Sequence, residues 1–263
     1  MLCSRSEAGA ARSDGAIVHI TSASALPQAV AQSVKRSEYM PPKKKRAAAQ
    51  TVKSSPMKRL RRGAKAKAAE DEPDKFTKFF NAYRSPGTEE IGPEGITKLC
   101  QDLGLDPANR KVLVLAWKLR AQRQGFFTRE EFCRGMMDLG ASDPQHLRRV
   151  LDSLEQGVIS SSSQFQPFCV YAFKFCLTEP AQRIIDLETA AQMLSIAMAG
   201  CPHVEPFTQF LMQQADYKTV NMDQWTGFLR FSQDVKPDCS NFDEAQAWPL
   251  LLDNYVEWRR KLS

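Results

Sequence analysis

The sequence has 263 residues and a formal net charge of +6, and its charges are unevenly distributed. Residues 1–75 contain 16 Lys and Arg against 7 Asp and Glu, whereas residues 76–263 contain 20 against 23. No apolar run reaches the ~18 residues that cross a bilayer, so we expect no membrane partner. The seven cysteines form no CxxC pair, which argues against a zinc module or a disulfide framework and for a reducing compartment.

Residues 1–75 form a basic tail with too few large apolar side chains to offset the entropy lost on ordering, so we expect disorder. Residues 1–39 weakly resemble a transit peptide, and Met40 is a candidate second translation start. Two basic clusters follow, a pattern that import receptors bind, and they predict nuclear localisation with a cytoplasmic fraction allowed. The alternative is a tail that binds nucleic acid through phosphates. The cluster residues are Lys43, Lys44, Lys45, Arg46, Lys58, Arg59, Arg61 and Arg62.

From residue 76 onward the apolar spacing is typical of helices, and strand alternation is almost absent. One helix is predicted to begin with Asp106 as N-cap and Pro107 in its first turn. The aromatic segment 165–176 predicts a buried central helix, with a strand as the alternative. A C-terminal helix is predicted over about 249–260, docking Trp248, Leu251 and Trp258 on the core.

The segment 120–131 has the spacing of an EF-hand calcium loop without its ligands. Gly125, Phe127 and Glu131 occupy loop positions 6, 8 and 12, as that loop requires. A calcium ion needs carboxylate oxygens at positions 1, 3 and 5. Those positions are held by Arg120, Gln122 and Gln124. We therefore expect a calcium-free loop and no heat of calcium binding in calorimetry.

Apolar residues at position 8 of related loops recur at matching intervals. Ile91 and Phe127 are 36 residues apart, and Ile185 and Val220 are 35 apart. The sequence therefore predicts an all-α domain over residues 76–260. It would contain two degenerate EF-hand-like lobes, at about 76–140 and 165–260, joined by a helix and a loop.

The sequence shows no catalytic motif. Covalent catalysis needs a nucleophile beside a base, and the only close pair is Cys201 and His203, whose side chains rarely face each other on a turn. We expect neither a catalytic residue nor a metal or other cofactor. We therefore interpret the folded part as a binding module, and we expect the protein to be monomeric.

The segment from Ser240 to Glu257, with its Ala-Trp-Pro run at 247–249, resembles the C-terminal signature of the defective-in-cullin-neddylation family, which carries the PONY domain. The resemblance covers roughly residues 76–260. Members of that family act as scaffold-type ligases without a covalent intermediate. They bind a cullin's C-terminal winged-helix subdomain and the acetylated N-terminus of the conjugating enzyme, so the resemblance implies both partners here. The start MPPKKKR and Gly92–Gly95 look most like its nuclear subgroup.

The resemblance implies two sites. The family's cullin-binding set corresponds to Asp223, Ala247 and Asp253. Independently, residues 234–257 hold six acids and one Lys, which favours a basic partner surface. Positions Pro93, Leu119 and Gly125 depart from some relatives. The implied apolar pocket for the conjugating enzyme is lined by Ile96, Ala108, Val112, Leu113, Leu115, Leu119, Gln124, Phe127 and Phe175. From the residues alone, ordinary core packing is the alternative for each, and the whole chain could be an adaptor or nucleic-acid-associated protein with no role in modifier transfer.

Overall fold

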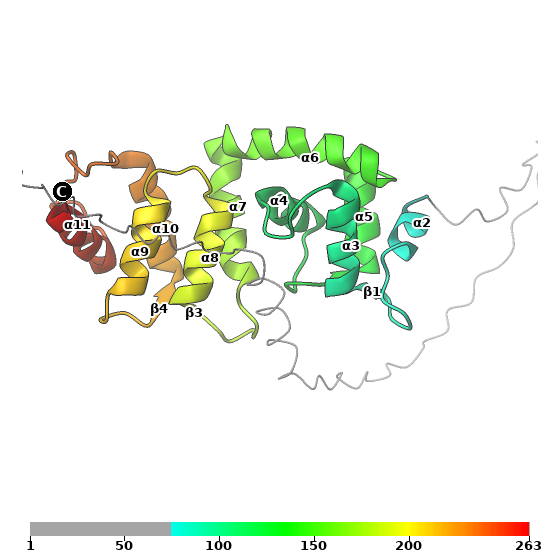
Figure 1. Cartoon of the computed structure of the whole chain (residues 1–263), viewed down its shortest axis with the longest axis horizontal. Helices are drawn as coiled ribbons and strands as arrows, with labels where there is room; N and C mark the ends of the chain where they lie inside the picture. The colour runs from blue at the N-terminus through cyan, green and yellow to red at the C-terminus, as the bar shows by residue number, and fades with distance from the viewer. Residues whose placement is uncertain (1–74, 263) are drawn as a thin grey trace, which may run out of the picture.

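The computed structural model describes residues 75–262, and the nuclear localisation clusters lie outside them. The described part is mostly helical, with short two-stranded pairings between helices, which confirms the predicted fold class. Figure 1 shows α2 and α11 at opposite ends of the molecule and α7 near its middle. The first half contains α2 (Lys75–Asn81), β1 (Glu90–Ile91), α3 (Pro93–Leu103), α4 (Arg110–Leu119), β2 (Phe127–Thr128), α5 (Arg129–Leu139) and α6 (Pro144–Ile159). The second contains α7 (Ser162–Phe175), β3 (Ile184–Asp186), α8 (Leu187–Ala197), α9 (Val204–Gln213), β4 (Thr219–Asn221), α10 (Met222–Asp234) and α11 (Leu250–Leu262).

Each lobe is closed by one antiparallel strand pair. Ile91 lies opposite Phe127 in the first pair, and Ile185 lies opposite Val220 in the second. All four side chains are buried. The two intervals read from the sequence predicted paired helix-loop-helix units, and the structure adds that each unit pairs through a short strand at these residues.

The segment 120–131 keeps the geometry of a calcium loop because hydrogen bonds within the loop take the place of the ion. Gly125 has φ +79, the left-handed conformation that favours glycine at the sharp turn. The carboxylate of Glu131, which would grip calcium from position 12, instead accepts hydrogen bonds from the backbone N–H groups of Gln122 (3.1 Å) and Thr128 (2.9 Å). Within residues 75–262 no cluster of three His, Cys, Asp or Glu side chains could hold a metal ion.

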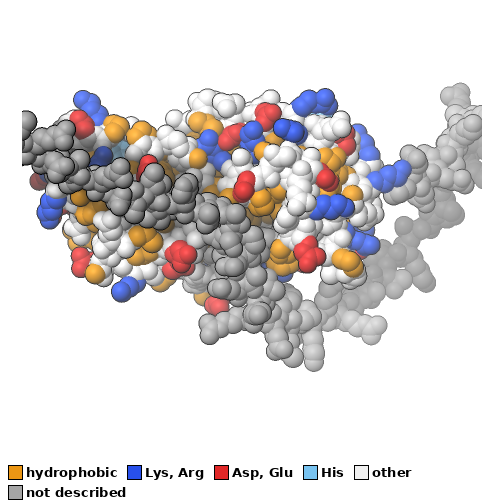
Figure 2. All heavy atoms as spheres, viewed as in Figure 1, with side chains coloured by type: hydrophobic (Ala, Val, Ile, Leu, Met, Phe, Trp, Pro, Cys, Tyr) orange, Lys and Arg blue, Asp and Glu red, His pale blue; other side chains and the backbone are white. Residues whose placement is uncertain are grey.

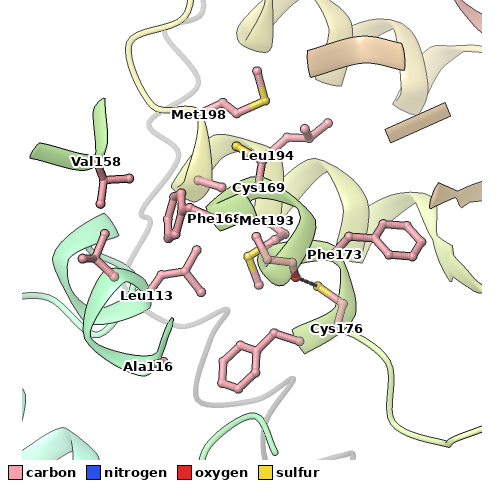
Figure 3. Close-up of a cluster of buried hydrophobic side chains, with 14 of the residues drawn as sticks. Leu113, Ala116, Val158, Phe168, Cys169, Phe173, Cys176, Met193, Leu194 and Met198 are labelled. Carbon is pink, nitrogen blue, oxygen red and sulfur yellow. Dashed lines mark hydrogen bonds between the residues drawn. The ribbon is translucent and has the colours of Figure 1, made fainter. Parts of the chain in front are cut away.

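The central helix α7 organises the core between the lobes, as the aromatic segment predicted. Figure 3 shows its Phe168, Cys169 and Phe173 among side chains from α4, α6 and α8. The Trp225 indole N–H on α10 donates to the Cys169 carbonyl at 2.9 Å, which ties α7 to the C-terminal half. The same helix therefore packs against both lobes, and the helical interpretation of this segment is confirmed.

The start of α4 differs from the prediction. Helix α4 begins at Arg110, because Asn109 caps it by accepting from the Lys111 N–H at 2.9 Å. Asp106 instead accepts from the Ala108 N–H at 2.7 Å in a separate turn. The Asp-Pro pair satisfies the rule for a helix start, but it closes a turn that precedes the helix.

The C-terminal helix α11 docks as predicted. Leu251 is buried, and Trp258 and Trp248 lie partly buried against Phe210 and Phe231, with ring centroids 5.7 Å apart in both pairs. Aromatic pairs at this separation add to the stabilisation from area burial. None of the helices between residues 75 and 262 combines the length and apolarity needed to cross a bilayer.

Candidate functional site

An apolar cavity of about 920 Å³ opens between the two lobes. One wall is α4, which presents Val112, Leu113 and Ala116. The opposite side is formed by Phe175 at the end of α7 and by α8. Figure 3 shows Leu113 and Ala116 of α4 facing the Phe168 and Met193 side of this core. The remaining lining residues come from α3, from the segment 85–92 before it, from the turn before α4, and from the calcium-like loop with the start of β2.

Most of the predicted pocket residues meet at this cavity. The six that line it are Ile96, Val112, Leu113, Gln124, Phe127 and Phe175. Leu115 and Leu119 do not line this cavity, because both are buried in the core packing of α4. A Cβ at Gly135 of α5 would lie 2.3 Å from Leu119 Cδ2, which shows how closely α5 packs against Leu119. Ala108 sits partly buried in the turn before α4 and is not among the lining residues.

The lining residues that sequence reasoning missed include Ala116, Phe126, Met193 and Ile196. Phe126 could have been found, since it is an apolar residue directly before the predicted lining residue Phe127. Met193 and Ile196 carry no such signal. They belong to α8 in the second lobe, and only the packing of the lobes brings them to a cavity centred on the first.

The cavity mouth is charged while its interior is apolar. Glu90 and Arg123 form an ion pair at the rim. The Arg123 guanidinium also lies over the Phe126 ring, 3.8 Å from its centroid, a cation–π contact that holds this ring at the opening. A buried polar group without a partner is costly, so the interior favours a ligand whose inserted end is uncharged. The polar rim can contact the backbone of the ligand residues that follow the inserted end.

A second surface carries the predicted acidic residues. Asp223 lies in the first turn of α10, and Ala247 lies in the segment before α11. Both are exposed, and together they line a depression of about 410 Å³ floored in part by Trp248 and Pro249. Asp253 lies in the first turn of α11 and is partly exposed. We call these three residues the acidic face.

Close packing of α10 and the segment before α11 positions this face. A Cβ at Gly227 would lie 2.7 Å from Pro249 Cγ, too close for a real contact. The Trp248 ring is held by the Arg230 guanidinium, 4.6 Å from its centroid, and the Trp248 indole N–H donates to the Asp243 carbonyl at 3.2 Å. The connection from α10 to α11 is therefore fixed at the point where Ala247 emerges.

On the acidic face, ionisation of Asp253 is disfavoured in the free protein. Partial burial, together with the charges of Glu244 and Glu257, raises the pKa of Asp253 above its usual value. Like charges in one place disfavour ionisation, and a cationic partner would remove that cost. Figure 2 shows several Lys and Arg side chains over the first lobe on the face in view.

Buried His203 connects the helices that carry the acidic face. It is buried, its Nε2 lies 2.9 Å from the Val235 carbonyl, and its Nδ1 lies 3.2 Å from the Tyr255 hydroxyl. Burial lowers the His203 pKa, so the neutral ring donates from Nε2 and accepts from Tyr255 at Nδ1. Both nitrogens thus join α9, α10 and α11, and neither is directed to Cys201 as a general base would be.

Together the fold and the two surfaces define a helical protein-binding module. The sequence model of the family described as Cullin binding matches residues 146–258. DCN1-like protein 2 of Dictyostelium discoideum is 42% identical over 183 residues, covering 70% of this chain and 68% of that protein. Human DCN1-like protein 4 is 43% identical, covering 67% of this chain and 60% of that protein, and human DCN1-like protein 5 is 41% identical, covering 69% and 76%.

The chain belongs to the DCN1-like family and carries its cullin-binding domain. It spans 60% of human DCN1-like protein 4. The match therefore concerns the helical domain described above.

Proposed function

We propose that this protein is a scaffold-type co-ligase that promotes transfer of the ubiquitin-like cullin modifier from its conjugating enzyme to cullins. Family membership supports a role in cullin neddylation. The observation that carries the proposal is the pairing of an apolar cavity with a separate acidic face on one helical body. We further propose, from the basic tail, that it acts in the nucleus after binding an import receptor.

The cavity would receive the acetylated N-terminus of the conjugating enzyme. Acetylation replaces an ammonium with a neutral amide, and desolvating a bare ammonium in an apolar cavity is costly. Val112 and Leu113 on one side and Phe175 and Ile196 on the other would contact the inserted side chain. Polar groups at the cavity mouth would accept hydrogen bonds from the backbone of the conjugating-enzyme residues that follow the acetylated N-terminus.

The acidic face would bind the winged-helix subdomain at the C-terminus of a cullin. Complementary charge raises association rates and fixes the orientation of a partner. Asp253 is destabilised by Glu244 and Glu257 in the free protein, so a cationic side chain placed beside it gains from relief of that repulsion.

The scaffold would act by proximity. Holding donor and acceptor together converts a bimolecular transfer into an effectively unimolecular one, which lowers the barrier by several kcal/mol without a nucleophile of its own. Burial raises the pKa of the Cys100 thiol to about 11 and those of Cys169 and Cys176 to about 12. These thiols are neutral at physiological pH, which supports a role in packing.

The proposal is tested by binding to acetylated and unacetylated N-terminal peptides of the conjugating enzyme. We expect the acetylated peptide to bind at least about tenfold more tightly, the ratio for one desolvated polar group. Val112→Trp should fill the cavity and abolish binding of the acetylated peptide. Met137→Trp is the control, since Met137 is exposed on α5 and away from the cavity.

Equal binding of the two peptides, or full binding by Val112→Trp, would remove the cavity from the proposal. The complete scaffold function is then measured as the rate of modifier transfer to a cullin. Wild-type protein should accelerate it, and Val112→Trp should not.

A further inference from the structure

One charged side chain joins the two lobes beside the cavity. Arg110, the first residue of α4, keeps only 16% of its side chain exposed. Its Nε donates to the Glu155 carboxylate of α6 at 2.9 Å. Its Nη1 donates to the carbonyl of Ala199, beyond the end of α8, at 2.7 Å. The guanidinium therefore connects three segments that are distant in the sequence.

The contact with Ala199 places a cation close to the C-terminal end of α8. Ala199 lies two residues past Ala197, the last residue of that helix, and a cation at a helix C-terminus is favoured by the helix dipole. Gly200, with φ +86, turns the chain immediately afterwards. Arg110 thus acts as a capping cation for α8 that is supplied by the other lobe.

The neighbouring cation makes no such connection. Lys111 Nζ lies 2.6 Å from Asp152 and 3.9 Å from Glu155, so it reaches the same helix α6 as Arg110 does. Its partner Asp152 is 59% exposed, and exposed pairs contribute little to stability. Arg110 and Lys111 therefore both form ion pairs with α6, but they differ in that Arg110 also contacts the second lobe.

The two segments joined by Arg110 are walls of the cavity. Helix α4 supplies Val112 and Leu113, and α8 supplies Met193 and Ile196. Arg110 precedes the first set by two residues, and Ala199 follows Ile196 by three. We infer that Arg110 is a positioning residue that fixes α8 against α4 and so sets the width of the cavity. Its effect on the conjugating-enzyme peptide rests on the proposed function.

An arginine suits this role better than a lysine. Its planar group presents several donors in a fixed arrangement, so one side chain can serve Glu155 and Ala199 together. A lysine carries one flexible ammonium. Burying a charge costs free energy that pairing recovers only in part, so Arg110 is better explained by the specific arrangement it imposes than by stability.

The experiment compares Arg110→Met, Arg110→Lys and Lys111→Met in the full chain. The first readout is backbone hydrogen exchange over residues 193–204, which needs no ligand. Arg110→Met should speed exchange there by roughly tenfold or more, the loss expected for a hydrogen bond to a charged group. Lys111→Met should leave exchange unchanged.

Arg110→Lys keeps the charge and decides the result if Arg110→Met does not fold. Because lysine cannot serve both acceptors, we expect exchange over residues 193–204 at least severalfold faster than in the wild type. Unchanged exchange in the folded Arg110 variants, or an equal rise in Lys111→Met, would overturn the inference.

The second readout is affinity for the acetylated peptide. It should fall severalfold in the Arg110 variants, while binding to a cullin stays at the wild-type level. If the wild-type protein binds no peptide, the proposed function fails, but the exchange measurement still decides the role of Arg110. Faster exchange with unchanged peptide affinity would reject control of the cavity width.

Discussion

The cavity and the acidic face recognise partners through opposite physical effects. The cavity is apolar inside, is assembled from both lobes, and selects by the cost of burying charge. The acidic face is exposed, belongs to the second lobe alone, and selects by charge complementarity. The cavity needs tight packing between the two lobes, whereas the acidic face needs packing within the second lobe and the ionisation of its two carboxylates. We therefore expect that a substitution can abolish binding at the cavity or at the acidic face without affecting the other surface.

The largest expected effect comes from reversing one charge of the acidic face. Asp253→Lys should weaken cullin binding by about 30-fold to 4,000-fold, because losing a close interfacial charge pair costs ~2–5 kcal/mol. Binding of the acetylated peptide should not change. Pull-down and calorimetry with a cullin winged-helix fragment measure the first effect.

Glu179→Lys is the matched control for that reversal. It changes the net charge equally at an exposed residue outside the acidic face. If Glu179→Lys weakened cullin binding as much as Asp253→Lys, net charge would explain the result and the local site would be rejected.

A smaller effect tests the packing beneath the acidic face. Gly227→Ala places a Cβ 2.7 Å from Pro249 Cγ, so Pro249 must shift and carry Ala247 away from Asp223. We expect cullin affinity to fall by roughly fivefold to tenfold, and Gly227→Ala with Pro249→Ala to recover part of it. A double-mutant cycle measures this coupling.

The helix α6 provides the control for that substitution. Gly157 has nothing within 4 Å of an added Cβ, so Gly157→Ala should raise stability by about 0.5–1 kcal/mol through helix propensity alone. Cullin affinity should stay unchanged. A loss of binding in Gly157→Ala would show that the assay reports general effects of alanine in helices.

The smallest effect concerns pH. Because the pKa of Asp253 is raised, its ionised form destabilises the folded state, and this cost is present above the folded pKa. Asp253→Asn should therefore slightly raise the melting temperature at neutral pH. The difference should fade as pH falls toward the ordinary carboxyl pKa, where wild-type Asp253 is protonated too. Cullin binding by the wild type should weaken over the same range.

An Asp253→Asn variant that melts below the wild type at neutral pH would contradict this account. It would mean that the Asp253 carboxylate stabilises the fold through a favourable contact. The acidic face would then be an ordinary structural feature, in contrast to the strained site inferred here.

Local sequence signals predicted the regular parts of the fold well. The two intervals between apolar loop residues predicted the pairs Ile91–Phe127 and Ile185–Val220, because each lobe repeats one helix-loop-helix unit. The signal failed at Asp106, where a turn and a helix N-terminus use the same capping chemistry. The clustering of acids near α11 was also visible, since most of that face is contiguous in the chain.

The sequence by itself determined most of the helices, the pairing of the helix-loop-helix units, the absence of calcium-binding carboxylates at loop positions 1, 3 and 5 in the segment 120–131, and the acidic C-terminal region. Periodicity and composition are local properties, so one chain suffices to read them. Only the tertiary structure decided that Leu115 and Leu119 face the core, that Ile196 reaches the cavity, and that Arg110 links the lobes. A buried face predicts that a helix packs, but the identity of its partner depends on contacts between segments far apart in the chain.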